Sequence, residues 1–128
     1  MKPFRALFCL CLILAACASG PAPISPEPRP PAEPESLVEC LARTGAHLYG
    51  ASWCHYCHDQ LVLFGPDASK VPYTDCDPDG TLELIPECTE KGLDFSSPFP
   101  TWIFGDGRHA IGVRSLDWLA YRTGCPAP

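Results

Sequence analysis

The chain has few basic residues. Nine lysines and arginines stand against 15 aspartates and glutamates in 128 residues, and the basic residues form no cluster. Proteins that bind nucleic acids neutralise phosphates with clustered Lys and Arg side chains. The composition therefore argues against nucleic acid as a partner.

Repeats and long apolar segments are also scarce. No internal repeat is visible, and the one pronounced apolar run, residues 6–16, is too short to span a bilayer as a stable helix. Lys2 and Arg5 precede this run, which gives residues 1–16 the form of an export signal. We therefore expect the protein to leave the cytoplasm.

The apolar run ends at residues 14–17 (LAAC), which resemble the lipobox of bacterial lipoproteins. This resemblance implies that Cys17 is lipidated and becomes the first residue of the mature chain. Ordinary signal cleavage is the alternative, because residues 16–18 also have the small-x-small form. A lipidated Cys17 places the protein in the bacterial envelope, facing the periplasm, and alanine at position 18 resembles lipoproteins sorted to the outer membrane.

Residues 17–35 form a proline-rich segment. From residue 18 onward this segment has seven prolines and no aromatic residue. Such a composition cannot bury enough apolar surface to offset the entropy of ordering, and it favours the extended polyproline form. We therefore expect residues 17–35 to be a semi-rigid tether and residues 36–128 to be the folded domain.

The pattern of residues 36–128 predicts alternating helices and strands. Ser36 and Glu39 have the spacing of a capping box, and Asp106-Gly107 is typical of a tight hairpin. Helices are expected at 36–45, 54–64, 86–91 and 115–124, and strands at 47–51, 71–76, 101–104 and 109–113. Because a helix between strands favours parallel pairing and a hairpin is antiparallel, the predicted fold class is α/β, with a mixed sheet flanked by helices on both faces.

Six cysteines fall within the expected domain, which fits an oxidising compartment. Two of the nine in the chain leave with the signal, and Cys17 is the candidate for lipidation. The remaining six are Cys40, Cys54, Cys57, Cys76, Cys88 and Cys125.

Cys54 and Cys57 form a C-x-x-C motif at the start of the second expected helix. A spacing of three places both sulfurs on one side of the first helical turn, where the helix dipole stabilises a thiolate at Cys54. We predict that Cys54 is the nucleophile and that Cys57, which is more buried, resolves the mixed disulfide. His55 and Tyr56 would tune the redox balance, and Trp53 would shape the substrate surface.

Two other interpretations of the motif are possible. A purely structural disulfide would stabilise the fold little, because it closes a very short loop. A metal site needs further ligands, and the chain has no second C-x-x-C and no H-x-x-x-H. A copper metallochaperone using Cys54, Cys57 and His58 is the alternative function. We expect no bound cofactor and no resident metal, and we interpret the acidic residues of 75–79 as a solvated turn rather than a calcium site.

These motifs resemble the thioredoxin family. Residues 53–57 (WCHYC) follow an expected strand, and residues 99–101 (FPT) lead into another. In that family the proline before the second of these strands is cis and faces the cysteines. The resemblance implies a cis Pro100 and a substrate-binding role for Phe99, Pro100 and Thr101. It also implies a thioredoxin-like fold whose first strand is reduced or missing.

Several segments are similar to one subfamily, the thioredoxin-like domain fused to bacterial and plant vitamin K epoxide reductase homologues. These segments are residues 48–51, 57–60, 63–65, 76–80, 99–102 and 112–116. The resemblance implies exchange with protein thiols and disulfides and a quinone-linked membrane oxidase as partner, here a separate protein. It favours disulfide formation, with a reductase of the same fold as the alternative.

The resemblance also implies a disulfide between Cys76 and Cys88, which we interpret as a staple of an irregular segment. Cys40 and Cys125 are additional to the subfamily and pair only by elimination, because the first and last helices of a thioredoxin layout cover opposite faces of the sheet. A free Cys125 that joins two molecules is the alternative. Leu48 stands where thioredoxin has a buried acid, so a carboxylate proton relay is absent there.

Overall fold

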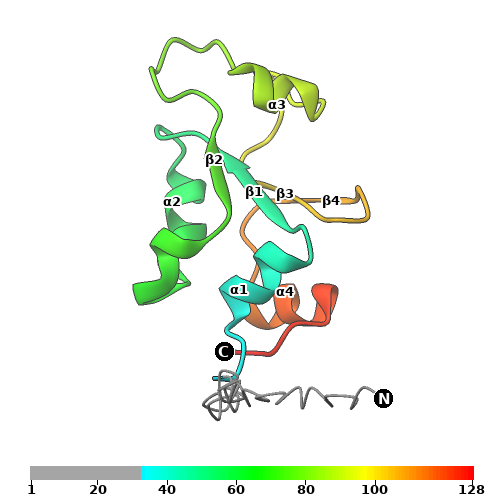
Figure 1. The fold of residues 1–128 in the computed structure, drawn as a ribbon. Helices are drawn as coiled ribbons and strands as arrows, with labels where there is room; N and C mark the ends of the chain where they lie inside the picture. The colour runs from blue at the N-terminus through cyan, green and yellow to red at the C-terminus, as the bar shows by residue number, and fades with distance from the viewer. Residues whose placement is uncertain (1–32) are drawn as a thin grey trace, which may run out of the picture. The chain divides into compact units, whose positions relative to one another are not determined.

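The computed structural model describes residues 33–128, whose helices and strands are shown in Figure 1. The expected signal peptide (1–16), Cys17 and the tether as far as residue 32 lie outside the described residues. Within residues 33–128, no helix is long and apolar enough to cross a membrane.

A four-stranded mixed sheet forms the centre of the domain. Its strands are β1 (His47–Gly50), β2 (Tyr73–Asp75), β3 (Thr101–Ile103) and β4 (His109–Ile111), in the order β2-β1-β3-β4. β1 pairs with β2 in parallel and with β3 antiparallel, and β3 pairs with β4 antiparallel. The parallel pair is possible because a helix connects β1 to β2. The predicted α/β class is confirmed, and the fold is thioredoxin-like, with no strand before β1 in the described part of the chain.

Capping residues mark the ends of several helices. They are α1 (Leu37–Arg43), α2 (His55–Val62), the 3-10 helix η1 (Gly65–Lys70), α3 (Pro86–Glu90) and α4 (Leu116–Thr123). The Ser36 hydroxyl accepts a hydrogen bond from the Glu39 backbone N–H, which completes the predicted capping box. Gly124 ends α4 with φ of 71°, a left-handed conformation that glycine adopts without steric cost.

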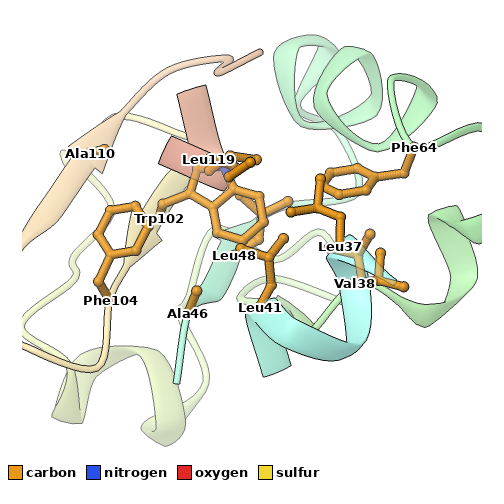
Figure 2. Packing of buried hydrophobic residues seen from close by; sticks show 12 residues of the cluster. Leu37, Val38, Leu41, Ala46, Leu48, Phe64, Trp102, Phe104, Ala110 and Leu119 are labelled. Atoms are coloured by element: carbon orange, nitrogen blue, oxygen red, sulfur yellow. The ribbon is translucent and has the colours of Figure 1, made fainter. Parts of the chain in front are cut away.

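Most of the apolar core lies on one face of the sheet. Leu48, Trp102 and Ala110 are adjacent in the strand register, and all three are buried. Figure 2 shows them in one cluster with side chains from α1 and α4 and with Phe64, which lies between α2 and η1. The expectation that α1 and α4 cover opposite faces is therefore wrong. Since α1 leads straight into β1 without an earlier strand, its apolar stripe packs on the same face as α4.

This shared face brings Cys40 and Cys125 together. Their Cα atoms lie 5.7 Å apart, and a disulfide joins them across a sequence separation of 85. Cys125 follows α4 rather than lying within it, and its backbone N–H donates to the Ala120 carbonyl at 3.0 Å. The bond therefore closes almost the whole domain into one covalent loop.

Gln60 is a fully buried polar residue on α2 that the sequence pattern did not single out. Its side-chain oxygen accepts from Trp102 Nε1 at 3.3 Å and from the Arg114 backbone N–H at 2.6 Å. Its Nε2 donates to the Arg114 carbonyl at 3.0 Å. Gln60 thus fixes α2, and with it the cysteine pair, against β3 and the segment before α4.

Candidate active site

Cys54 and Cys57 lie where the chain passes from β1 into α2. Cys54 is the N-cap residue of α2, and its sulfur accepts a hydrogen bond from the Cys57 backbone N–H at 3.2 Å. The two Cα atoms are 5.3 Å apart, and a disulfide joins the side chains. When this bond is reduced, the Cys54 sulfur lies at the positive end of the helix, where a thiolate is stabilised.

The two cysteines differ in access to solvent. Cys54 is 8% exposed and Cys57 is 2% exposed. Both pack with Ala51 in a small cluster that Phe99 covers from one side. Cys54 is therefore the more accessible cysteine of the pair.

The segment before β3 lies against this cluster. The Phe99–Pro100 peptide bond is cis, and the Pro100 carbonyl accepts from the Gly112 backbone N–H at 2.8 Å. Phe99 also contacts a second apolar cluster, which includes Cys76 and Cys88. Thr101 is buried, and its hydroxyl donates to the Pro98 carbonyl at 2.6 Å. Phe99 therefore lies beside the cysteines. The buried Thr101 side chain stabilises the backbone of residues 98–101 through its hydrogen bond to Pro98.

Aromatic side chains surround Cys54 on the surface. Trp53 and Tyr56 are both exposed, as is Phe95. The ring centroid of Trp53 lies 6.2 Å from that of Phe95 and 6.3 Å from that of Phe99. Large exposed apolar groups clustered at one place are typical of an interaction site.

His55, between the two cysteines, points to solvent. Its side chain is 81% exposed, with Nε2 3.4 Å from the Asp59 carboxylate, and its ring centroid lies 6.0 Å from that of Tyr56. A contact between side chains this exposed contributes little to stability. His55 and Tyr56 are therefore surface side chains that lie between the two cysteines in the chain.

The interpretation of residues 75–79 as a solvated turn is wrong for Asp77, which is 0% exposed, whereas residues 78 and 79 do form an exposed turn. Its carboxylate accepts from Trp53 Nε1 at 2.7 Å and from the backbone N–H groups of residues 81 and 82 at 2.9 and 3.2 Å. The neighbouring Cys76 is joined to Cys88, with Cα atoms 5.8 Å apart. Asp77 therefore ties Trp53 to a segment that the second disulfide holds in place.

Asp77→Ala should lower the free energy of unfolding by roughly 2–4 kcal/mol, because three N–H donors lose their acceptor. It should also shift the fluorescence of Trp53, since the indole N–H loses the carboxylate that holds it. Denaturant unfolding and emission spectra measure the two effects. Asp79→Ala, at an exposed position of the same turn, is the control and should change neither. Equal stability of the two variants would contradict this role for Asp77.

The copper-carrier alternative rests on Cys54, Cys57 and His58, which line one pocket. Across residues 33–128, no group of three or more His, Cys, Asp or Glu side chains could hold a metal ion. His58 lies beside the pocket that Cys54 and Cys57 line. His47 lies instead on β1, where Nε2 is 2.8 Å from the Thr74 hydroxyl and burial lowers the pKa of the imidazole.

Comparison with known proteins points to redox chemistry. No protein-family model matches the chain. It is 36% identical, over 93 residues, to the protein named thiol-disulfide oxidoreductase LTO1 from Arabidopsis thaliana, and the alignment covers 70% of this chain. The chain spans only 24% of the length of LTO1. The fold, the cysteine pair and this similarity together relate the chain to the thioredoxin-like redox proteins.

Proposed function

We propose that the protein is a thiol-disulfide oxidoreductase that exchanges disulfides with other proteins through Cys54 and Cys57. The main support is the placement of the pair, at the first turn of α2, with Cys54 the more exposed sulfur and an aromatic surface around it. A short loop at a helix start contributes little as a staple and is well suited to exchange. The name of the relative from Arabidopsis thaliana supports the same enzyme class.

The reaction needs only the two cysteines and the substrate. A substrate thiolate attacks the Cys54 sulfur, the bond between Cys54 and Cys57 breaks, and Cys57 leaves. A second substrate thiolate then attacks the substrate sulfur of the mixed disulfide, and Cys54 leaves as a thiolate that the helix terminus stabilises. Two electrons pass from the substrate dithiol to the pair, and the same steps in reverse reduce a substrate disulfide.

We further propose that the protein forms disulfides in the bacterial envelope. Residues 1–17 support export and lipid attachment at Cys17, on the periplasmic side of the outer membrane. The three disulfides within residues 33–128 fit an oxidising compartment. A separate quinone-linked membrane protein would re-oxidise Cys54 and Cys57. Palmitate labelling should be lost in Cys17→Ala, and unchanged labelling would contradict the anchor.

Exchange activity tests the proposed class directly. The purified protein should accelerate both the reduction of insulin by a dithiol and the oxidation of reduced ribonuclease. Acceleration of ribonuclease oxidation by the pre-oxidised protein in stoichiometric amounts would support disulfide formation as its direction. Stoichiometric Cu(I) binding with no exchange activity would instead support a copper carrier.

A further inference from the structure

Cys57 needs a group that exchanges its proton. The sulfur becomes a free thiol or thiolate whenever the pair opens, yet Cys57 is only 2% exposed. The preceding strand β1 has the sequence HLYG and therefore offers no carboxylate. A carboxylate that exchanges a proton with Cys57 therefore has to come from another element of the fold.

A pocket of about 240 Å³ lies beside Cys57 and reaches strand β2. Tyr73 and Asp75 from β2 line it, together with His58 from α2. The parallel register places Tyr73 opposite Leu48 and Asp75 opposite Gly50, so both β2 side chains lie on the Leu48 face of the sheet. Gln60 of α2 bonds to this face through Trp102, the neighbour of Leu48 on β3. The pocket is large enough for water molecules, which can carry a proton between its walls.

Gly50 makes this approach possible. A Cβ atom at position 50 would lie 2.8 Å from the Cys57 sulfur, 2.9 Å from Tyr73 Cε2 and 3.0 Å from the Tyr73 hydroxyl. The sulfur and the phenol therefore crowd around the same point. Burial and the nearby Asp75 carboxylate raise the pKa of Tyr73 to about 12, so the phenol stays protonated near neutral pH. Tyr73 can donate a hydrogen bond to a thiolate but cannot be the base.

Asp75 has a carboxylate that is fixed on one side and free on the other. Its Oδ1 accepts from the Ser52 backbone N–H at 3.2 Å and from the Asp77 backbone N–H at 3.0 Å. Its Oδ2 forms no hydrogen bond with any group of residues 33–128. Two backbone amides thus orient the carboxylate, and one oxygen is left to bind water in the pocket.

We propose that Asp75 is the proton-transfer residue for Cys57, acting through water in this pocket; the proposal rests on the proposed function. When Cys57 resolves a mixed disulfide, its thiol proton passes through water to Asp75, the Cys57 sulfur bonds to Cys54, and the substrate leaves as a thiolate. When a substrate thiolate opens the pair, Cys57 leaves as a thiolate and takes up a proton that Asp75 has first accepted from water in the pocket.

Three other titratable side chains lie near this carboxylate. Tyr73 stands on the same strand and His58 lines the pocket from α2. Asp77, in the following loop, has its carboxylate occupied by Trp53 and two backbone amides. His58 is exposed and is the competing candidate for the base. A test must therefore separate Asp75 from His58.

The test follows one half-reaction. Cys54 of the full protein is first loaded with 5-thio-2-nitrobenzoate, and release of this coloured thiol by Cys57 is followed between pH 5 and pH 9. Asp75→Asn keeps an oxygen for the two amides but loses the basic carboxylate. We expect Asp75→Asn to release the thiol roughly 10- to 100-fold more slowly than the wild type near neutral pH. The difference between the two rates should narrow at high pH, where hydroxide removes the Cys57 proton in both proteins. In the reduced Asp75→Asn protein, Cys54 should be alkylated at the wild-type rate, because the start of α2 stabilises its thiolate.

The controls are Asp79→Asn and His58→Gln, both of which should release the thiol at the wild-type rate. Asp75→Glu, which keeps a carboxylate, should recover most of the rate. If Asp75→Asn does not fold, Asp75→Ser, which also offers an oxygen to the backbone amides but has no carboxylate, takes its place with the same expected slowing. Release from Asp75→Asn at the wild-type rate overturns the proposal, and so does slow release from His58→Gln alone. Equal slowing at every pH, together with slower Cys54 alkylation, indicates a structural role and also overturns it. The proposed function is tested separately, by measuring whether the wild-type protein exchanges disulfides with insulin or ribonuclease.

Discussion

Cys54→Ser should lose disulfide exchange with proteins, with a rate reduced roughly a thousandfold or more. Cys54 is the N-cap of α2 and the more exposed sulfur of the pair, so it alone can attack or be attacked by a substrate. Cys57→Ser should retain the attack but not the resolving step, and should therefore accumulate a mixed disulfide with the substrate. Insulin reduction measures the rate, and non-reducing electrophoresis with mass spectrometry detects the trapped complex.

The control for this experiment is the double variant Cys76→Ser, Cys88→Ser. These cysteines are fully buried and pack in a separate cluster, so the double variant should retain exchange at temperatures where it is folded. Substantial exchange by Cys54→Ser would contradict the assignment of the nucleophile. A folded Cys76→Ser, Cys88→Ser variant without exchange would show that the second disulfide also carries electrons.

The disulfide between Cys40 and Cys125 should have the largest effect on stability. It joins positions 85 residues apart, and cross-linking so long a loop removes much of the entropy of the unfolded chain. We expect the double variant Cys40→Ser, Cys125→Ser to lose about 4 kcal/mol of unfolding free energy. For a domain of this size that corresponds to a fall in Tm of roughly 20 °C, which calorimetry measures.

The matched control for this variant is the double variant Cys54→Ser, Cys57→Ser. It also removes one disulfide, but the lost loop spans a separation of only three residues, so the fall in Tm should be much smaller. Exchange activity should survive in Cys40→Ser, Cys125→Ser below its own Tm, because the bond lies outside the cysteine cluster at α2. Equal Tm values for the two double variants would contradict a staple between α1 and the end of α4.

The elements of the fold could be predicted because their signals are local. The capping box at Ser36, the Asp106-Gly107 turn and Gly124 each act within a few residues, and each lies where the structure begins or ends an element. The sharing of one sheet face by α1 and α4 could not be predicted. Apolar stripes show that a helix is buried on one side, but they do not say which layer it packs against.

The candidate site was predictable to a similar degree. Cys54 and Cys57 follow from spacing and from their place at a helix start. Asp77 was misinterpreted because its burial depends on Trp53, 24 residues earlier, while its own neighbours are typical of a solvated turn. Asp75 reaches the pocket through the register of β2 on β1, which strand patterns alone do not determine.

The reduction potential of the Cys54–Cys57 disulfide tests the central claim most directly. The protein is equilibrated in glutathione or dithiol buffers of graded potential, alkylated, and the redox state of each cysteine is read by mass spectrometry. We expect a midpoint between about −270 and −120 mV, the range of exchange enzymes, while Cys40–Cys125 and Cys76–Cys88 stay oxidised. A midpoint for Cys54–Cys57 below about −300 mV, in the range of structural disulfides, would contradict a role in exchange.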